Sequence, residues 1–66
     1  MSTAIANYIA AFTRAYPQKK CEVKFSHKRN GEEHFHVFVD GDRGDGGLTL
    51  THSDLREATA QFLKGM

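Results

Sequence analysis

Alternation of apolar and polar residues along two runs, joined by Asn30-Gly31, constrains the fold of this chain more than any other feature. The runs are CEVKFS, residues 21–26, and HFHVFV, residues 34–39. A period of two is typical of strands with one buried face, and Asn-Gly between two such runs is a strong signal for a β-hairpin. The sequence therefore predicts an antiparallel hairpin with one apolar and one polar face.

The register of this hairpin depends on the length of its turn. A two-residue turn would pair Arg29 with Glu32 and would mix apolar and polar residues on both faces. A three-residue loop with a left-handed glycine pairs Lys28 with Glu32 and Phe25 with Phe35, and it keeps the apolar residues together. Because a slip by one residue inverts the faces of a strand, burial favours the three-residue loop.

This register decides which side chains face solvent. The core face is expected to hold Cys21, Val23, Phe25, Phe35, Val37 and Val39. The outer face is expected to pair Glu22, Lys24, Ser26 and Lys28 with Phe38, His36, His34 and Glu32. His27 then lies on the core side, and the two histidines of the second strand point away from the core.

Two segments outside the hairpin have the spacing of amphipathic helices. Residues 2–16 repeat apolar side chains every three or four positions, with Ser2 as a suitable N-cap and Pro17 closing the segment. Residues 51–64 repeat the pattern, and Gly65 is a suitable C-terminal stop. Both segments are therefore predicted to be helices with one buried face.

The order of elements indicates the fold class. The short run LTLT, residues 48–51, predicts a third strand between the hairpin and the last helix. The expected fold is α+β, in the order α-β-β-β-α, with a three-stranded antiparallel sheet and two helices packed on one face. Residues 1–66 are expected to form a single small domain.

Length and composition limit the classes of protein. A chain of 66 residues with 39% hydrophobic residues and a net charge of +1 is expected to fold with modest stability. It has no apolar leader and no apolar run near the roughly 18 residues that cross a bilayer, so we expect a cytoplasmic protein without a membrane partner. The single cysteine, Cys21, cannot form an internal disulfide. A homodimer is expected as readily as a monomer.

His34 and His36, two positions apart on one strand face, are candidate metal ligands. A metal site needs a third and usually a fourth ligand, and the expected cross-strand neighbours Ser26 and Lys24 do not supply them. The same open face would shelter a catalytic histidine poorly from water, and the register turns Cys21 inward. The sequence therefore predicts no metal, no cofactor and no enzymatic activity.

The glycine-rich segment DGDRGDGG, residues 40–47, fits neither of two familiar ligand-binding loops. It lacks the order of residues and the closing glutamate of a calcium-binding loop. Its three aspartates repel phosphate, and no Lys-Ser/Thr follows it. We expect a flexible loop from which Asp40, Asp42 and Asp45 reach a basic partner.

Cations and an aromatic residue gather on the predicted hairpin. The candidate binding residues there are Lys24, Lys28, Arg29, His34, His36 and Phe38. Cations contact phosphates and aromatic rings stack on bases, so this face also fits single-stranded nucleic acid. The small net charge of +1 and the interleaved glutamates favour an ordinary solvated face with cross-strand ion pairs.

The layout resembles that of the double-stranded-RNA-binding domain. The resemblance rests on the order of elements, on the glycine-rich turn before the last strand and on the final helix, DLREATAQFL. That family contacts phosphates through lysines at the start of its last helix. In this chain only Arg56 there matches in charge, and Asp54 opposes it. The resemblance therefore implies a layout and transfers no binding residues.

The leading hypothesis is a small intracellular protein-binding module that uses its open sheet face and its acidic loop. Accessory or inhibitor-like proteins of this size, including those of phages and other mobile elements, often work by occupying a surface of a larger assembly. The alternative is a nucleic-acid-binding module that uses the basic face of the hairpin.

Overall fold

Helix α1 (Thr3–Ala15) forms where apolar residues recur at helical spacing. The structure is a computed structural model that describes residues 2–65. Ser2 caps the helix, because its hydroxyl accepts a hydrogen bond from the Ile5 N–H at 3.4 Å. The helix ends at Ala15, and its C-cap Tyr16 directly precedes Pro17, which disfavours helical geometry in the residue before it. The predicted cap and end of this helix are confirmed.

Helix α2 (His52–Lys64) begins at a reciprocal pair of hydrogen bonds. The Thr51 hydroxyl accepts from the Asp54 N–H at 3.2 Å, and the Asp54 carboxylate accepts from the Thr51 N–H at 3.0 Å. This capping box satisfies two backbone donors, one of them an N–H in the first turn of the helix that has no partner within it. The helix ends at Lys64 with Gly65 as its C-cap, as the sequence predicts.

Strands β1 (Cys21–Arg29) and β2 (Glu32–Val39) form the predicted hairpin, but with a different turn. Asn30 and Gly31 have φ angles of 52° and 79°, and Arg29 pairs with Glu32. Two successive positive φ angles define a two-residue turn whose twist matches that of the strands. The predicted three-residue loop is therefore wrong.

The register of the core half of the hairpin is nevertheless the predicted one. Phe25 pairs with Phe35, and the same register continues to Cys21 opposite Val39. A β-bulge between Phe25 and His27 absorbs one extra residue and changes the register towards the turn. The chain thus satisfies both the turn preference of Asn-Gly and the burial of its apolar residues.

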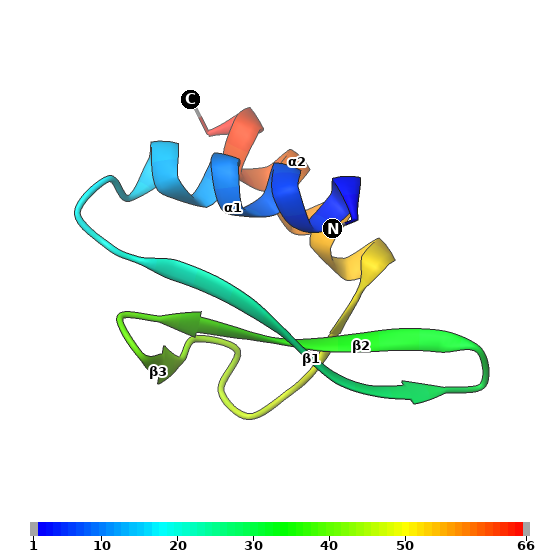
Figure 1. The fold of residues 1–66 in the computed structure, drawn as a ribbon. Helices are drawn as coiled ribbons and strands as arrows, with labels where there is room; N and C mark the ends of the chain where they lie inside the picture. Colours follow the sequence, from blue (N-terminus) through cyan, green and yellow to red (C-terminus); the bar gives the residue numbers. More distant parts are fainter. Residues whose placement is uncertain (1, 66) are drawn as a thin grey trace.

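The third strand is split into two short pieces on the same side of β2. Strand β3 (Asp42–Arg43) pairs with residues 38–39, and strand β4 (Leu50–Thr51) pairs with residues 34–35. Residues 44–49 stand opposite only residues 36–37, so they leave the sheet edge as a loop, here called the 44–49 loop. Figure 1 shows this loop swinging to the side of the sheet opposite the helices.

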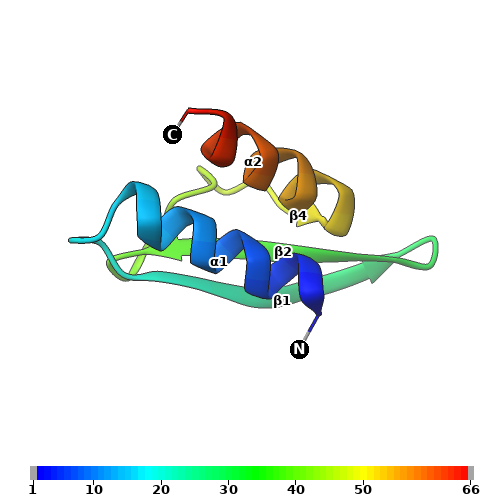
Figure 2. The same cartoon turned by 90° about the horizontal axis from the view of Figure 1, so that it is seen from above.

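Both helices pack on one face of the sheet, as predicted (Figure 1, Figure 2). A core cluster between the two layers is formed by Tyr8, Phe35, Val37 and Leu55, of which Leu55 is fully buried, and the other buried apolar residues are Ala4, Ala11 and Phe12. The order α-β-β-β-α, with β2 in the middle of the sheet, confirms the predicted α+β fold. The opposite face of the sheet is left without a covering helix.

The far half of the hairpin projects beyond α1 (Figure 2). Phe25, which the sequence places in the core, packs edge-on against Phe35 at 6.0 Å between ring centroids but remains 57% exposed. The expectation that Phe25 is buried is wrong, because the helices are too short to cover this part of the sheet.

Candidate interaction surface

The sheet face opposite the helices, here called the outer face, carries most of the polar groups that the sequence singles out. The observed register and the alternation of strand residues assign its members. They are Glu22, Lys24, His27, Arg29, Glu32, His34, His36, Phe38 and Arg43. The outer face is therefore a mixed surface of cations, histidines, one aromatic ring and two carboxylates.

The bulge after Phe25 changes the tip of this face. His27 faces His34, and their rings stack at 4.7 Å between centroids with an interplanar angle of 6°. Lys28 pairs with Glu33 and turns to the helix side, where Glu33 lies 3.1 Å from His52 Nε2. The predictions that His27 faces the core and that Lys28 shares the outer face with Lys24 are wrong, since the extra residue inverts the alternation.

The exposed Lys24 and the half-buried Phe38 lie at the centre of the outer face. The Lys24 ammonium lies 5.2 Å from the centroid of the Phe38 ring and 3.8 Å from the Glu22 carboxylate. A cation over an aromatic face is attracted by the ring quadrupole, by about 0.5–1 kcal/mol at exposed sites. The pair therefore presents a cation and an apolar ring side by side.

His36 is held between a carboxylate and a guanidinium. Its Nδ1 lies 3.2 Å from Asp45 Oδ2, and its Nε2 lies 2.6 Å from Arg43 Nη2. Because a carboxylate only accepts, the His36 Nδ1–H donates to Asp45, and Arg43 Nη2 also lies 3.0 Å from His36 Nδ1. The cluster therefore holds Arg43 beside His36 at the surface.

Asp45 anchors the 44–49 loop to the sheet. Its Oδ2 accepts from the Val37 N–H at 3.2 Å, and its Oδ1 accepts from the Gly47 N–H at 3.1 Å. The carboxylate thus replaces the backbone carbonyl that an unbroken third strand would have offered to β2. With a side-chain exposure of 1%, Asp45 is not available to a basic partner, and that prediction is wrong.

The pKa of Asp45 reflects this anchoring. Burial of the carboxylate raises the pKa, but hydrogen bonds from His36 and from the Gly47 and Val37 N–H groups outweigh burial. Together with the charge of His36 they hold the pKa below its ordinary value. The ionised carboxylate is therefore part of the folded structure.

His34 is also tied to the loop rather than free. Its Nδ1 lies 3.0 Å from Thr49 Oγ1, and its Nε2 lies 3.9 Å from Glu32 Oε1. The side chains of His34 and His36 are each 18% exposed. Both histidines lie on the outer face as predicted, but as supports of the loop more than as exposed contacts.

The predicted binding residues therefore separate into three places. Lys24, His36 and Phe38 come together at the centre of the outer face, while Lys28 and Arg29 lie at the far tip of the hairpin. Asp42 is exposed in β3, opposite Val39, at the other end of the sheet. Arg43 was missed, although its place two residues before Asp45 in a segment flanked by strand signals could have indicated a shared site.

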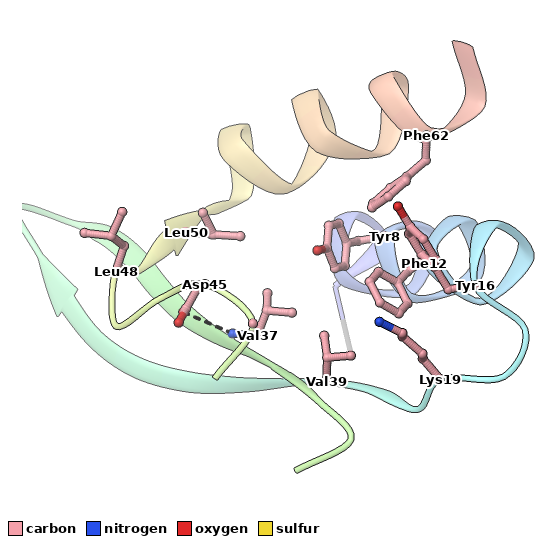
Figure 3. A pocket seen from close by; sticks show the side chains of 11 residues that line it. Tyr8, Phe12, Tyr16, Lys19, Val37, Val39, Asp45, Leu48, Leu50 and Phe62 are labelled. Atoms are coloured by element: carbon pink, nitrogen blue, oxygen red, sulfur yellow. Dashed lines mark hydrogen bonds between the residues drawn. The ribbon is translucent and has the colours of Figure 1, made fainter. Parts of the chain in front are cut away.

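An apolar groove of about 600 Å³ opens between the helices and the sheet, beside the 44–49 loop (Figure 3). It exists because this loop leaves the position at which a third strand would have covered the core. Aromatic rings of both helices line it, and the Lys19 ammonium lies 5.8 Å from the centroid of the Tyr16 ring. The residues that bring polar side-chain groups to its lining are Lys19, Asp45, Tyr8 and Tyr16.

Cys21 is a poor nucleophile in this fold. Burial raises the pKa of its thiol above the ordinary value, and the Glu22 carboxylate adds to the shift. The reactive thiolate is therefore scarce at neutral pH.

Within residues 2–65, three or more histidine, cysteine, aspartate or glutamate side chains do not converge in a way that could hold a metal ion. In the same part of the chain, the helices are too short and too polar to cross a membrane. Comparison with protein-family models, with curated proteins and with solved structures finds no significant match. Function must therefore be argued from the surface itself.

Proposed function

We propose that the protein is a small intracellular binding module, accessory or inhibitor-like, that holds another protein against its outer face. The observation that carries this proposal is the uncovered centre of that face, where Lys24 and Arg43 flank the Phe38 ring. Arginine and aromatic residues dominate the binding energy of protein interfaces.

Rigidity supports the same proposal. Asp45 and His36 hold Arg43 in place, so little conformational entropy is lost when the guanidinium meets a partner. Both signs of charge are present, because Glu22 and Glu32 lie among the cations. A mixed face of this kind complements a protein surface that also carries both charges.

The double variant Phe38→Ala/Arg43→Ala is expected to weaken binding of the partner about 30-fold, as loss of two central contacts implies. The partner is obtained by affinity capture from nuclease-treated lysate, and its binding to the purified variants is measured by calorimetry. Lys28→Ala and Asp42→Ala are the controls, since both residues lie away from the centre of the outer face. Equal weakening by the controls, or unchanged affinity of the double variant, contradicts the proposal.

A nucleic-acid-binding module is the second candidate, favoured by the 5.2 Å contact of the Lys24 ammonium with Phe38. Lys24, Arg29 and Arg43 would contact three phosphates while Phe38 stacks on a base. Affinity for a single-stranded oligonucleotide, measured by fluorescence anisotropy, should then fall about 20-fold between roughly 50 and 200 mM salt. Binding that is absent, or insensitive to salt, eliminates this candidate.

A further inference from the structure

Strand β1 has an open edge. Strand β2 pairs with β1 on one side and with β3 and β4 on the other, and across residues 2–65 nothing pairs with the far side of β1. Figure 2 shows β1 along the border of the sheet. An open edge presents backbone N–H and C=O groups that another strand can bond. Proline, a common protection of such edges, does not occur between Cys21 and Arg29.

Backbone hydrogen bonds show which residues turn these groups towards the open edge. The Asp40 N–H donates to the Lys20 C=O at 2.8 Å, so the backbone of Lys20 faces β2. Along an antiparallel strand, successive residues direct their N–H and C=O groups to opposite sides. The regular part of β1 therefore presents three residues to the open edge, namely Cys21, Val23 and Phe25.

The bonding of β2 gives the same answer independently. Val37, which pairs with Val23, receives a hydrogen bond on its C=O from the Gly44 N–H at 2.9 Å. Its own N–H donates to Asp45 at 3.2 Å. Both backbone groups of Val37 thus point away from β1, so Val23 is not bonded to it and must point outward.

We propose that two copies of this chain pair antiparallel along their β1 edges, about a two-fold axis that passes between their Val23 residues. In this register Val23 bonds Val23 of the second copy, and Cys21 bonds Phe25 of the second copy, each through outward backbone groups. Glu22 of each copy faces Lys24 of the other on the outer face. The short segment from residue 21 to residue 25 is therefore complementary to itself in backbone bonding and in charge.

Other registers are less favourable on the same grounds. An axis at Lys24 would oppose two lysines, and it would set Cys21 opposite His27, beyond the bulge, so that backbone bonding would be confined to Val23 and Phe25. An axis at Phe25 would run the pairing through the bulge between Phe25 and His27. An axis at Cys21 would take half of the pairing outside β1.

Burial favours this pairing as well. Phe25 is 57% exposed on the helix side of the sheet, and in the proposed dimer its ring packs beside Cys21 of the second copy. Apolar area removed from water stabilises association by about 25 cal/mol per Å². Pairing also joins the two sheets into one, so that two outer faces form a continuous surface.

Charge reversal tests the register. In Glu22→Lys, and separately in Lys24→Glu, both cross-copy pairs become repulsive, and the dissociation constant of the dimer should rise about tenfold or more. The double variant Glu22→Lys/Lys24→Glu restores opposite charges and should restore the dimer. Sedimentation equilibrium over a range of concentrations measures the mass against the chain mass of 7.4 kDa.

Amide exchange tests the edge directly and does not depend on any variant. In the dimer the Val23 N–H should be as strongly protected as that of Lys24, and dilution should expose the outward N–H groups of Cys21, Val23 and Phe25 while that of Lys24 stays protected. A protein that stays monomeric at millimolar concentration overturns the proposal. So does a dimer in which the Val23 N–H exchanges freely, or one that the double variant fails to restore.

Discussion

Leu55→Ala is expected to remove most of the stability of the fold and to leave the protein only marginally stable at room temperature. Leu55 is fully buried and belongs to the cluster formed with Tyr8, Phe35 and Val37. Truncation of a buried leucine costs about 3 kcal/mol, through lost apolar burial and the cavity that remains. A core of this size supplies a net stability of only about 3–5 kcal/mol, so one such loss consumes most of it.

The matched control is Leu63→Ala, in the same helix. Leu63 is 52% exposed, and its truncation should cost about 1 kcal/mol at most. Urea titrations followed by circular dichroism, at one fixed protein concentration, compare the free energies of unfolding. Equal losses in the two variants would show that α2 does not pack through Leu55.

The hairpin shows what a sequence pattern can and cannot decide. The alternation of apolar and polar residues predicts the pairing of Val23 with Val37 and of Phe25 with Phe35, because only one register there buries one face of both strands. It does not predict the bulge at the far end, since the turn and the core each fix a register and only an extra residue reconciles them. The predicted turn is therefore wrong because the turn preference of Asn-Gly and the burial of the apolar face are compatible, whereas the prediction makes them alternatives.

The sequence pattern likewise predicts one part of the outer face and not the other. The alternation of β2 predicts His36 and Phe38 on one side, and the structure brings Lys24 beside them. The roles of Arg43 and Asp45 depend on a gap in the third strand, which no periodicity in a six-residue loop reveals. A glycine-rich segment indicates that the chain leaves the sheet, but not that a carboxylate takes the place of the missing strand.

Asp45→Ala is expected to lower the free energy of unfolding by about 2 kcal/mol, because it removes charge-assisted hydrogen bonds and leaves the Val37 N–H without a partner. Asp45→Asn should cost about half as much. The asparagine oxygen can still accept from the two groups that bond Oδ2, His36 Nδ1 and the Val37 N–H. Its NH₂ group then faces the Gly47 N–H, and two donors cannot bond each other. Asp42→Asn, at an exposed residue of β3, is the control and should change stability by less than about 0.5 kcal/mol.

The dependence of this effect on pH follows from the sign of the pKa shift. The pKa of Asp45 in the folded protein lies below its ordinary value of 3.8, so ionisation of this carboxylate stabilises the folded state relative to the unfolded chain. The contribution of the Asp45 carboxylate to stability is complete at pH values above its ordinary pKa. This contribution is lost as the pH falls through the pKa of Asp45 in the folded protein. The difference in unfolding free energy between the wild type and Asp45→Asn should therefore shrink on acidification below 3.8. Urea titrations across the acid range in which both proteins still fold measure this difference. If it stays constant or grows, the carboxylate does not anchor the loop, and Arg43 must then be held at the outer face by His36 alone.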